Sequence, residues 1–350
     1  VGGQIPNSLA IKLAKNNVKI IGTKAEDIDK AEDRYKFSSI LDELNIPQPV
    51  WNKLKSMDQA KKFATQIGYP VLIRPSYVLS GSAMQVANDE NELESYLKIA
   101  TEVSPEHPVV ISKFFTESRE VEVDAVSDGE NVFIGAIIEH VEEAGVHSGD
   151  ATLSIPTLTV DENVKNKIRD YTRKIARKLN IKGPFNIQFL VKNGNVYVIE
   201  CNLRASRSMP FVSKTIGINL MELAANAMLG EKVENDEPTP IKFSVKSPQF
   251  SFMRLEGADP ITSVDMVSTG EVACFGKDFN EAFLKSLIAA GFKLPKKSIL
   301  LSTGPIKTKE YLLPSVRKLA EMGFELFATD GTAKFLESNN VKTTVLYWPL

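Results

Sequence analysis

Residues 186–202 read NIQFLVKNGNVYVIECN, and their pattern predicts a β-hairpin. Two strand-like segments flank a Gly-containing loop at Asn193-Gly194, which is typical of a hairpin. Strands of this kind, in a chain that also carries amphipathic helices, indicate an α/β or α+β protein. What the hairpin means for function depends on which of its polar side chains share a face.

The register of the hairpin determines which polar side chains share a face. If the turn has two residues, Gln188 and Glu200 point to opposite faces of the sheet. If the loop has three residues, Lys192 pairs with Val196 and Gln188 lies directly opposite Glu200. A site therefore requires the three-residue loop, which gathers Gln188, Glu200 and Asn202 on one face as oxygen ligands suited to Mg²⁺ and not to Zn²⁺. A solvent-facing polar edge is the alternative.

Two arginines, Arg204 and Arg207, follow the hairpin directly. Guanidinium groups beside a metal indicate an anionic ligand, because their paired N–H groups match the oxygens of phosphate or carboxylate. Upstream, the small residues of the loop 74–84 would let backbone N–H groups approach a phosphate, although a plain turn explains them too. The loop lacks the Gly-Lys-Ser/Thr ending of a P-loop, so we do not expect a P-loop enzyme.

Further polar candidates lie in the middle of the chain. Glu120, Glu122 and Asp124 alternate with valines, which places three carboxylates on one face of a strand. An acidic face exposed to solvent is the simpler interpretation. The loop 145–150, GVHSGD, carries His147, a candidate hydrogen-bond donor to a phosphoryl or carbonyl oxygen.

Composition excludes several classes of protein. The 350 residues are 43% hydrophobic and 25% charged with a formal charge of −2, so we expect a globular protein of two or more domains with no nucleic-acid partner. Its two cysteines, Cys201 and Cys274, form no metal-binding or disulfide pattern. No apolar run reaches the roughly 18 residues of a membrane span, so no membrane partner is expected. The chain opens on Val1, which suggests an internal piece of a longer protein.

The order of predicted elements divides the chain. Residues 18–21 (VKII) predict a buried strand, and helices then alternate with strands from about residue 26 to residue 231. A charged, Pro-ended segment at 231–240 predicts a linker. After residue 297 the pattern predicts a βαβαβ start of a parallel sheet. Predicted helices span residues 31–44, 58–68, 90–101, 164–179, 281–290, 311–322 and 333–338, and the predicted strands of the last unit span 298–301, 324–328 and 343–347.

Six segments together resemble the carbamoyl-phosphate synthetase large chain, in its C-terminal, carbamate-phosphorylating half. They are Ala31–Arg34, Arg74–Leu79, Gly145–Asp150, Gln188, Glu200–Arg204 and Pro210–Lys214. The resemblance implies an α/β (α+β) fold, an ATP-grasp domain followed by a partial, Rossmann-like methylglyoxal-synthase-like domain. The implied parts are the tail of a pre-ATP-grasp domain at 1–24, the ATP-grasp domain at 25–236, a connecting part of the carbamoyl-phosphate synthetic unit at 237–295 and the partial allosteric domain at 296–350.

The same resemblance implies roles for single residues. Nucleotide binding would involve Arg34, Arg74, Lys113, Phe115, Glu120, Gly145, Val146, His147, Ser148, Gln188 and Glu200. The divalent ion, Mg²⁺ or Mn²⁺, would be held by Gln188, Glu200 and Asn202, and the catalytic residues would be Arg204, Arg207 and His147. A monovalent cation, normally K⁺, would lie at Glu120, His140 and Val146, and an effector would bind at Thr329, Thr332 and Trp348.

The implied reaction is carbamate plus MgATP giving carbamoyl phosphate plus ADP, the second half-reaction of carbamoyl phosphate synthesis from bicarbonate, ammonia or glutamine, and two ATP. The implied partners are the N-terminal synthetase half and an ammonia-supplying part of the same or a partner chain. Ala205 and Cys274 resemble the urea-cycle type, which implies N-acetylglutamate as effector, the mitochondrial matrix as location, and urea or arginine synthesis. Pyrimidine synthesis, in the cytoplasm, is the alternative.

Two other functions remain open at this point. A different ATP-grasp ligase, such as a biotin carboxylase, would share the Gln, Glu and Asn metal ligands but should lack the appended βαβαβ unit. A regulatory nucleotide- or effector-binding module without turnover should have lost a metal ligand, whereas Gln188, Glu200 and Asn202 are all present.

Overall fold

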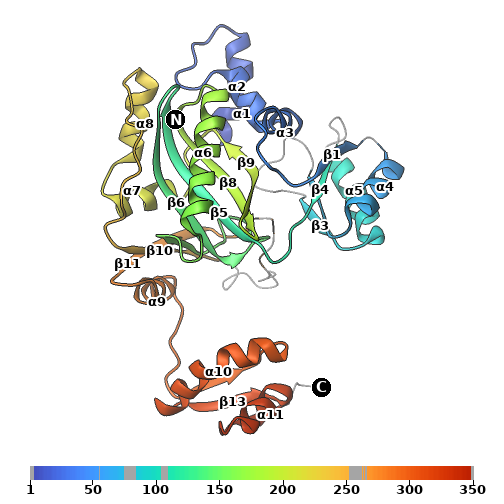
Figure 1. Cartoon of the computed structure of the whole chain (residues 1–350), viewed down its shortest axis with the longest axis vertical. Coiled ribbons are helices and arrows are strands. Elements are labelled where there is room, and N and C mark those ends of the chain that lie inside the picture. The colour runs from blue at the N-terminus through green and yellow to red at the C-terminus, as the bar shows by residue number, and fades with distance from the viewer. Residues whose placement is uncertain are drawn as a thin grey trace. The chain divides into compact units, whose positions relative to one another are not determined.

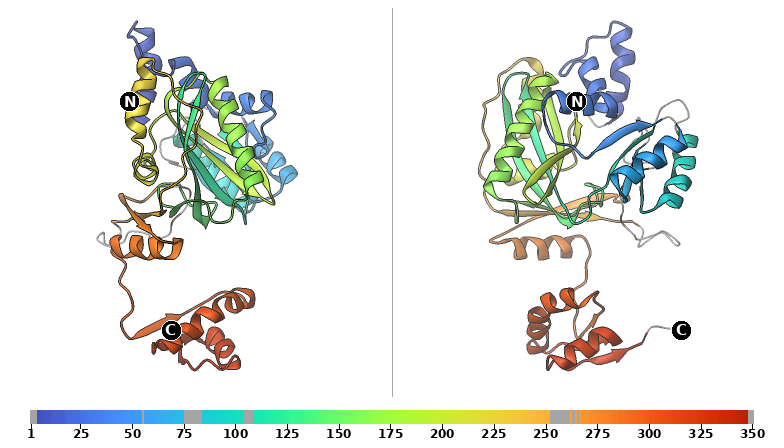
Figure 2. Two further views of the ribbon diagram at one scale, coloured as in Figure 1. Left: turned by 60° about the vertical axis from the view of Figure 1, so that its left-hand side comes forward. Right: turned by 45° about the vertical axis from the view of Figure 1, so that its right-hand side comes forward.

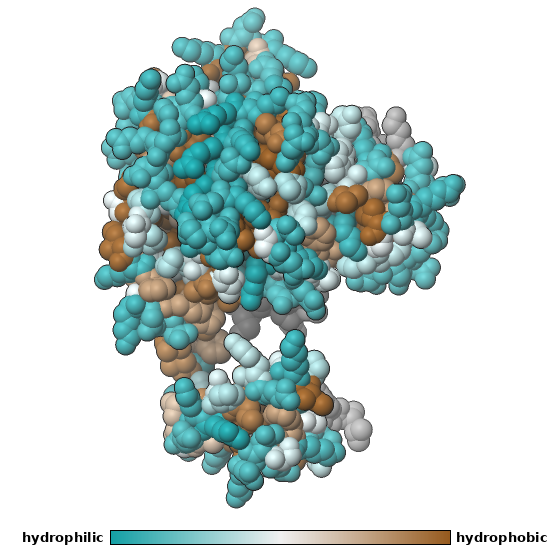
Figure 3. Space-filling model, viewed as in Figure 1, coloured by the Kyte–Doolittle hydropathy of each residue, from teal (hydrophilic) through white to brown (hydrophobic). Residues whose placement is uncertain are grey.

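The computed structural model describes residues 4–54, 56–74, 84–103, 109–251, 262, 264 and 266–347. The chain forms two units, Val1–Ala290 and Gly291–Leu350. Hydrophilic side chains cover most of the surface visible in Figure 3, with apolar groups in scattered patches. No helix in the described ranges is long and apolar enough to cross a membrane.

A seven-stranded antiparallel sheet is the centre of the first unit (Figure 1), with strand order β11-β10-β7-β6-β5-β8-β9. Apolar side chains of α6 (Glu162–Lys178) pack against one face, where Val121, Val123 and Ile187 are buried. Helices α7 (Met209–Ile216) and α8 (Leu220–Leu229) pack against Phe133 and Ile138 on the other. The strands are β5 (Arg119–Asp128), β6 (Val132–Glu143), β7 (Leu153–Ile155), β8 (Lys182–Lys192), β9 (Asn195–Asn202), β10 (Phe243–Gln249) and β11 (Gly270–Gly276).

A smaller sheet stands beside it, with strand order β1-β4-β2-β3 and only antiparallel pairs. Helices α4 (Met57–Ile67) and α5 (Glu90–Val103) pack on this sheet through a separate apolar cluster that includes Ala64 and Leu93 (Figure 2). The sheet is therefore a second lobe with its own core. Its strands are β1 (Trp51–Leu54), β2 (Val71–Arg74), β3 (Gln85–Ala87) and β4 (Val109–Lys113).

Three helices, α1 (Gln4–Lys15), α2 (Ala25–Glu32) and α3 (Arg34–Glu43), precede the two sheets, and here two predictions were wrong. No strand forms at residues 18–21, where Val18 and Ile21 remain 47% and 55% exposed. The predicted helix 31–44 is interrupted at Asp33, whose carboxylate accepts hydrogen bonds from the N–H groups of Tyr35 and Lys36 and caps α3. This break makes Arg34 the first residue of a new helix.

The second unit is a three-stranded parallel sheet in the order β12-β13-β14, which confirms the predicted βαβαβ pattern. Its elements are β12 (Ser298–Leu301), α10 (Ile306–Glu321), β13 (Glu325–Thr329), α11 (Asp330–Ser338) and β14 (Thr344–Leu346). Helix α9 (Phe279–Ala289) belongs to the first unit, where it contacts β10 and β11.

Candidate active site

In the β8–β9 hairpin Gln188 pairs with Glu200, as the proposed site requires, but the turn is shorter than predicted. Its turn has two residues, because Lys192 pairs with Asn195, and Asn193 and Gly194 have φ of 51° and 74°. The required three-residue loop was therefore wrong. Phe189 pairs with Val198 but Gln188 pairs with Glu200, so Ile199 is an extra residue that forms a β-bulge. The bulge shifts the register, and Gln188 faces Glu200 after all.

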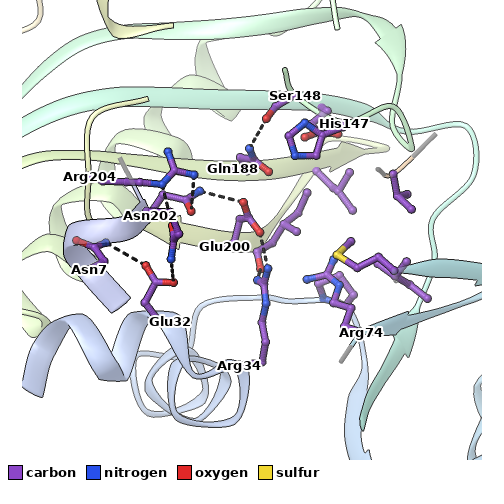
Figure 4. A pocket seen from close by; sticks show the side chains of 18 of the residues that line it. Asn7, Glu32, Arg34, Arg74, His147, Ser148, Gln188, Glu200, Asn202 and Arg204 are labelled. Carbon is purple, nitrogen blue, oxygen red and sulfur yellow. Dashed lines mark hydrogen bonds and ion pairs between the residues drawn. The ribbon is translucent and has the colours of Figure 1, made fainter. Parts of the chain in front are cut away.

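These strands open onto a cavity of about 590 Å³ (Figure 4). Residues of both sheets and of helices α1, α2 and α3 line it. Nearly all of the predicted site residues are among them, although they come from segments far apart in the sequence: Arg34, Arg74, Lys113, Phe115, Glu120, Gly145, Val146, His147, Ser148, Gln188, Glu200, Asn202 and Arg204. The structure thus collects one candidate site, while the individual roles remain predictions.

Glu200 is a carboxylate in the cavity that accepts hydrogen bonds from two neighbouring side chains. Its Oε2 accepts a hydrogen bond from Arg34 Nη2 at 2.5 Å, and its Oε1 accepts one from Asn202 Nδ2 at 2.9 Å. Burial by itself would raise the pKa of Glu200, but Arg34, Asn202 and the charge of Arg74 outweigh it and lower that pKa to about 2. Glu200 is therefore ionised at every physiological pH.

The donor chemistry around Glu200 fits a hard divalent cation. Gln188 donates its Nε2 to Ser148 Oγ at 2.9 Å, which leaves its amide oxygen available. One ionised carboxylate with two amide oxygens is an oxygen-only set of the kind that Mg²⁺ or Mn²⁺ takes, completed by water and phosphate. Gln188, Glu200 and Asn202 are thus suited to hold that ion.

Arg74 supplies a second positive charge to the cavity, on its other side. Burial, helped by the neighbouring charge of Arg34, lowers the pKa of Arg74 to about 9. Its Nε is buried, and no described residue accepts a hydrogen bond from it. A buried guanidinium with an unused donor needs an anion, and an oxyanion such as phosphate would complete it.

The acidic strand is not a solvent face, which corrects the simpler interpretation. Glu120, Glu122 and Asp124 are only 7%, 3% and 0% exposed. Ser206 Oγ and Asn186 Nδ2 both donate to Asp124 Oδ1, at 2.6 and 2.9 Å, because the segment after β9 folds over this face of the strand. The alternation of carboxylates and valines therefore describes a strand buried on both faces.

Glu120 alone of these three carboxyl groups lines the cavity. Burial, with the charges of Glu122 and Glu200, raises the pKa of Glu120 to about 8. Its Oε1 lies 4.0 Å from His140 Nδ1. Burial, with the charge of Lys246, lowers the pKa of His140 to about 3, so this imidazole is neutral.

Arg207 is not among the residues that line the cavity, and its catalytic role stays a prediction. It pairs with Glu271 of β11 at 2.6 Å and donates to Ser268 Oγ at 3.2 Å. Glu271 of β11 thus fixes the orientation of this guanidinium. Arg204, in contrast, does line the cavity, and its Nη2 lies 3.3 Å from Asn202 Oδ1.

The cavity residues that escaped the sequence argument include Gln4, Asn7 and Glu32. Gln4 and Asn7 lie on α1, one turn apart, and both donate to Glu32. The available signal was their i, i+3 spacing, which places two amides on one face of a helix otherwise recognised by its apolar residues.

The predicted effector residues are partly described. Thr329, the last residue of β13, donates its Oγ1 to Ser302 Oγ at 3.2 Å, and the buried Thr332 of α11 has its Oγ1 3.3 Å from Oγ1 of Thr303, just after β12. Trp348 and residues 75–83 of the predicted phosphate loop lie outside the described residues.

Comparison with known proteins settles the family. Residues 33–236 match the family model described as "Carbamoyl-phosphate synthase L chain, ATP binding domain". The chain belongs to the carbamoyl-phosphate synthase large-chain family. Residues 311–350 match an MGS-like domain, so both domains of the predicted resemblance are confirmed.

Relatives of two kinds resemble this carbamoyl-phosphate synthase chain almost equally. The "Multifunctional protein pyr1-3" of Dictyostelium discoideum is 53% identical over 349 residues, which are 99% of this chain and 16% of that protein. The mitochondrial "Carbamoyl-phosphate synthase [ammonia]" of Homo sapiens is 51% identical over 357 residues, 100% of this chain and 24% of that protein. The chain thus spans a quarter or less of these relatives, and identity does not separate the two types.

Solved structures bear out the fold. The biotin carboxylase of Campylobacter jejuni, solved as a β-γ-ATP complex, superposes with a TM-score of 0.68, covering 81% of this chain and 71% of that one at 20% identity. N5-carboxyaminoimidazole synthase of Aspergillus clavatus gives 0.66, covering 81% and 79% at 14% identity. The carbamoyl-phosphate synthase chain therefore has the ATP-grasp fold, as predicted.

Proposed function

We propose that this chain transfers the γ-phosphoryl group of ATP to carbamate, giving carbamoyl phosphate and ADP. The observation that carries the proposal is the meeting, in one cavity, of the oxygen ligands Gln188, Glu200 and Asn202 with the guanidinium groups of Arg74 and Arg204. Two anions must approach each other in this reaction, and positive charge fixed on both sides of the metal ligands lowers the cost of that approach.

Other cavity residues would hold the nucleotide. Lys113 Nζ donates to the carbonyl oxygens of Gly68 and Tyr69 at 2.8 and 2.9 Å, which fixes it at the wall where we place the adenine. Phe115 packs edge-on against Tyr197 and offers an apolar surface beside it. Glu120 would contact the ribose. The loop from Gly145 to Ser148 would cover the phosphates and exclude water, which protects carbamate from hydrolysis.

In the transfer itself, a carbamate oxygen forms a bond to the γ-phosphorus while the bond from that phosphorus to the β–γ bridging oxygen breaks, and ADP leaves with the electron pair. Arg74 and Arg204 would orient the phosphoryl oxygens. His147 accepts a hydrogen bond from the Gly149 N–H on Nδ1, so the neutral ring carries its proton on Nε2, the nitrogen we assign to a phosphoryl oxygen. A bound Mg²⁺ would neutralise charge on the transferring group.

The finer parts of the proposal concern context. We place K⁺ near Glu120, His140 and Val146, and assign the chain to the second half-reaction, with bicarbonate activation and ammonia supply by other parts of the protein or a partner. Ala205 and Cys274 favour the urea-cycle type in the mitochondrial matrix. A thermal shift of the chain with N-acetylglutamate, lost in Thr332→Ala, would support that type, and no shift would favour the cytoplasmic pyrimidine type.

The decisive experiment is ATP formation from carbamoyl phosphate and MgADP. We expect activity in the chain and a loss of at least about a hundredfold in Glu200→Ala, because a direct ligand should cost no less than an outer-shell partner. Glu200→Gln keeps the side-chain size if the alanine variant fails to fold, and Glu130→Ala, on an exposed turn, is the matched control. A folded chain that binds MgADP without making ATP would contradict the proposal.

A further inference from the structure

Two side chains of helix α1 donate hydrogen bonds to the two oxygens of the Glu32 carboxylate, which lines the cavity. Gln4 Nε2 donates to Glu32 Oε2 at 2.6 Å, and Asn7 Nδ2 donates to Glu32 Oε1 at 3.1 Å. Asn7 Nδ2 also reaches the carbonyl oxygen of Leu203 at 3.2 Å, directly before Arg204 in the chain. The helix is thereby fixed to the end of α2 and to the segment that leaves β9.

From Gln4 the hydrogen bonds continue into the metal site. Gln4 Oε1 accepts from Arg204 Nε at 3.0 Å, and Arg204 Nη2 donates to Asn202 Oδ1 at 3.3 Å. Asn202 in turn donates to Glu200. Figure 4 shows Glu32, Arg204, Asn202 and Glu200 along one side of the cavity. An unbroken series of side chains therefore leads from α1 to the carboxylate proposed to bind the metal.

The amide of Gln4 has a specific electrostatic consequence. It stands between the carboxylate of Glu32 and the guanidinium of Arg204, so Arg204 is oriented through Nε without direct contact with an anion. A direct pair with Glu32 would neutralise much of the charge that an incoming phosphoryl group needs. A neutral linking group preserves that charge and fixes its direction.

We propose that Gln4 is a positioning residue for Arg204 and Asn202, so that helix α1 is part of the phosphoryl-transfer site although it precedes the matched region 33–236. The inference rests on the proposed function. Gln4 acts through Arg204 and through the metal ligand beside it, and its loss should affect turnover and metal affinity more than nucleotide affinity.

The first test is Gln4→Ala in the ATP-forming assay. We expect kcat to fall about tenfold with KM for ADP changed less than twofold, the size typical of an outer-shell partner. Gln4→Glu, which places a carboxylate against Arg204 Nε, should lower kcat at least as far. Asn16→Ala is the control, because its amide donates only to the Lys12 carbonyl after the end of α1. Unchanged kcat in a folded Gln4→Ala would overturn the inference.

A double-mutant comparison separates positioning from general support of the fold. Arg204→Lys keeps a positive charge but lacks the Nε–H that Gln4 accepts. If Gln4 acts through Arg204, adding Gln4→Ala to Arg204→Lys should change kcat less than twofold. Additive losses in the double variant would mean that Gln4 supports only the fold, and would overturn the positioning role.

Binding of Mn²⁺ in the presence of ADP, followed by electron paramagnetic resonance, provides a readout that needs no turnover. We expect Gln4→Ala to weaken Mn²⁺ about tenfold, because Arg204, which donates to Asn202, loses the acceptor that orients it. If the chain binds Mn²⁺ without making ATP, the proposed function is wrong, but the Mn²⁺ affinity of Gln4→Ala still tests whether Gln4 positions the metal ligands. Equal Mn²⁺ affinity in Gln4→Ala and the unchanged chain would count against the inference.

Discussion

At the residue scale, Glu200 shows how burial and pairing compete for one proton. Burial favours the neutral acid, but Arg34 with its 2.5 Å hydrogen bond, Asn202 and the charge of Arg74 together favour the carboxylate more strongly. The pKa of about 2 lies below the ordinary value, so this pair stabilises the fold above about pH 4.5 and that contribution is lost as the pH falls toward 2. The carboxylate proposed to hold the metal is thus ionised in the absence of the metal.

Replacing Arg34 should expose the opposing effect of burial. In Arg34→Met we expect the pKa of Glu200 to rise, so Mn²⁺ affinity should decrease as the pH is lowered from 8 to 5, whereas the unchanged chain should show no such dependence from Glu200. Lys36→Met removes a charge from the same helix outside the cavity lining and is the control. Parallel pH profiles of Mn²⁺ affinity in Arg34→Met and the unchanged chain would contradict this account.

At the element scale, the β8–β9 hairpin shows where local sequence stops being informative. The strands and the Asn-Gly turn follow from the residues, but the bulge at Ile199 does not. The Val198 N–H donates a hydrogen bond to the Pro47 carbonyl, and the Ile199 carbonyl accepts one from Arg34. Two backbone groups at the bulge therefore bond to distant segments of the chain. Side chains of a regular strand alternate with a period of two residues, so this pattern does not reveal an additional residue such as Ile199.

Other predictions were wrong for the same reason, because they depended on contacts between segments far apart in the sequence. The apolar residues at 18–21 predicted a strand, but no neighbouring strand pairs with them in the described part of the chain. Alternation at Glu120 to Asp124 gave the right strand and the wrong environment, since burial of the polar face depends on the segment around Ser206. Gln4 and Glu32 are joined by a fold that brings α1 beside α2. Most of the motif residues line one cavity, but their hydrogen-bond partners from distant segments could not be predicted.

The hairpin turn offers a stability test away from the cavity. Gly194 has φ of 74° with open space where a Cβ would project, so Gly194→Ala should cost about 1 kcal/mol of unfolding free energy through backbone strain alone. ATP formation per folded molecule should be unchanged. Gly270→Ala, where φ is not in the left-handed region, is the control in urea denaturation. Equal stability of the two variants would contradict the strain argument.

A second element-scale prediction concerns the turn between β5 and β6. Asp128 accepts hydrogen bonds from the N–H groups of Glu130, Asn131 and Val233; burial opposes ionisation, but these bonds lower the pKa of Asp128 to about 2. Asp128→Asn should destabilise the chain by about 1–2 kcal/mol at pH 7, with the difference shrinking as the pH falls from about 4 toward 2. Thermal melting across this range measures it, with Asp236→Asn as the control. A pH-independent difference would show that charge is not the cause.

At the scale of the whole molecule, the chain divides at residue 290 into two units, and every described residue lining the cavity lies in the first. The second unit has its own apolar core, including Val316 and Ala328. The candidate site and the small parallel sheet thus belong to separate compact units.

Removing residues 291–350 should therefore leave the first unit folded. We expect its melting temperature and its rate of ATP formation to stay close to those of the whole chain, measured by circular dichroism and by the coupled ATP assay. A shortened chain that unfolds at the temperature where the whole chain remains native would show that the second unit is required for stability.

Strands β10 and β11 lie after residue 236, where the matched ATP-binding region ends, yet β10 hydrogen-bonds to β7 and completes the main sheet. A chain cut at 236 would leave the apolar residues Leu153 and Ile155 on an open edge strand. Unpaired edges of this kind recruit strands from other molecules. Expression of the matched region alone should yield aggregates, and the practical boundary for a soluble fragment is Ala290.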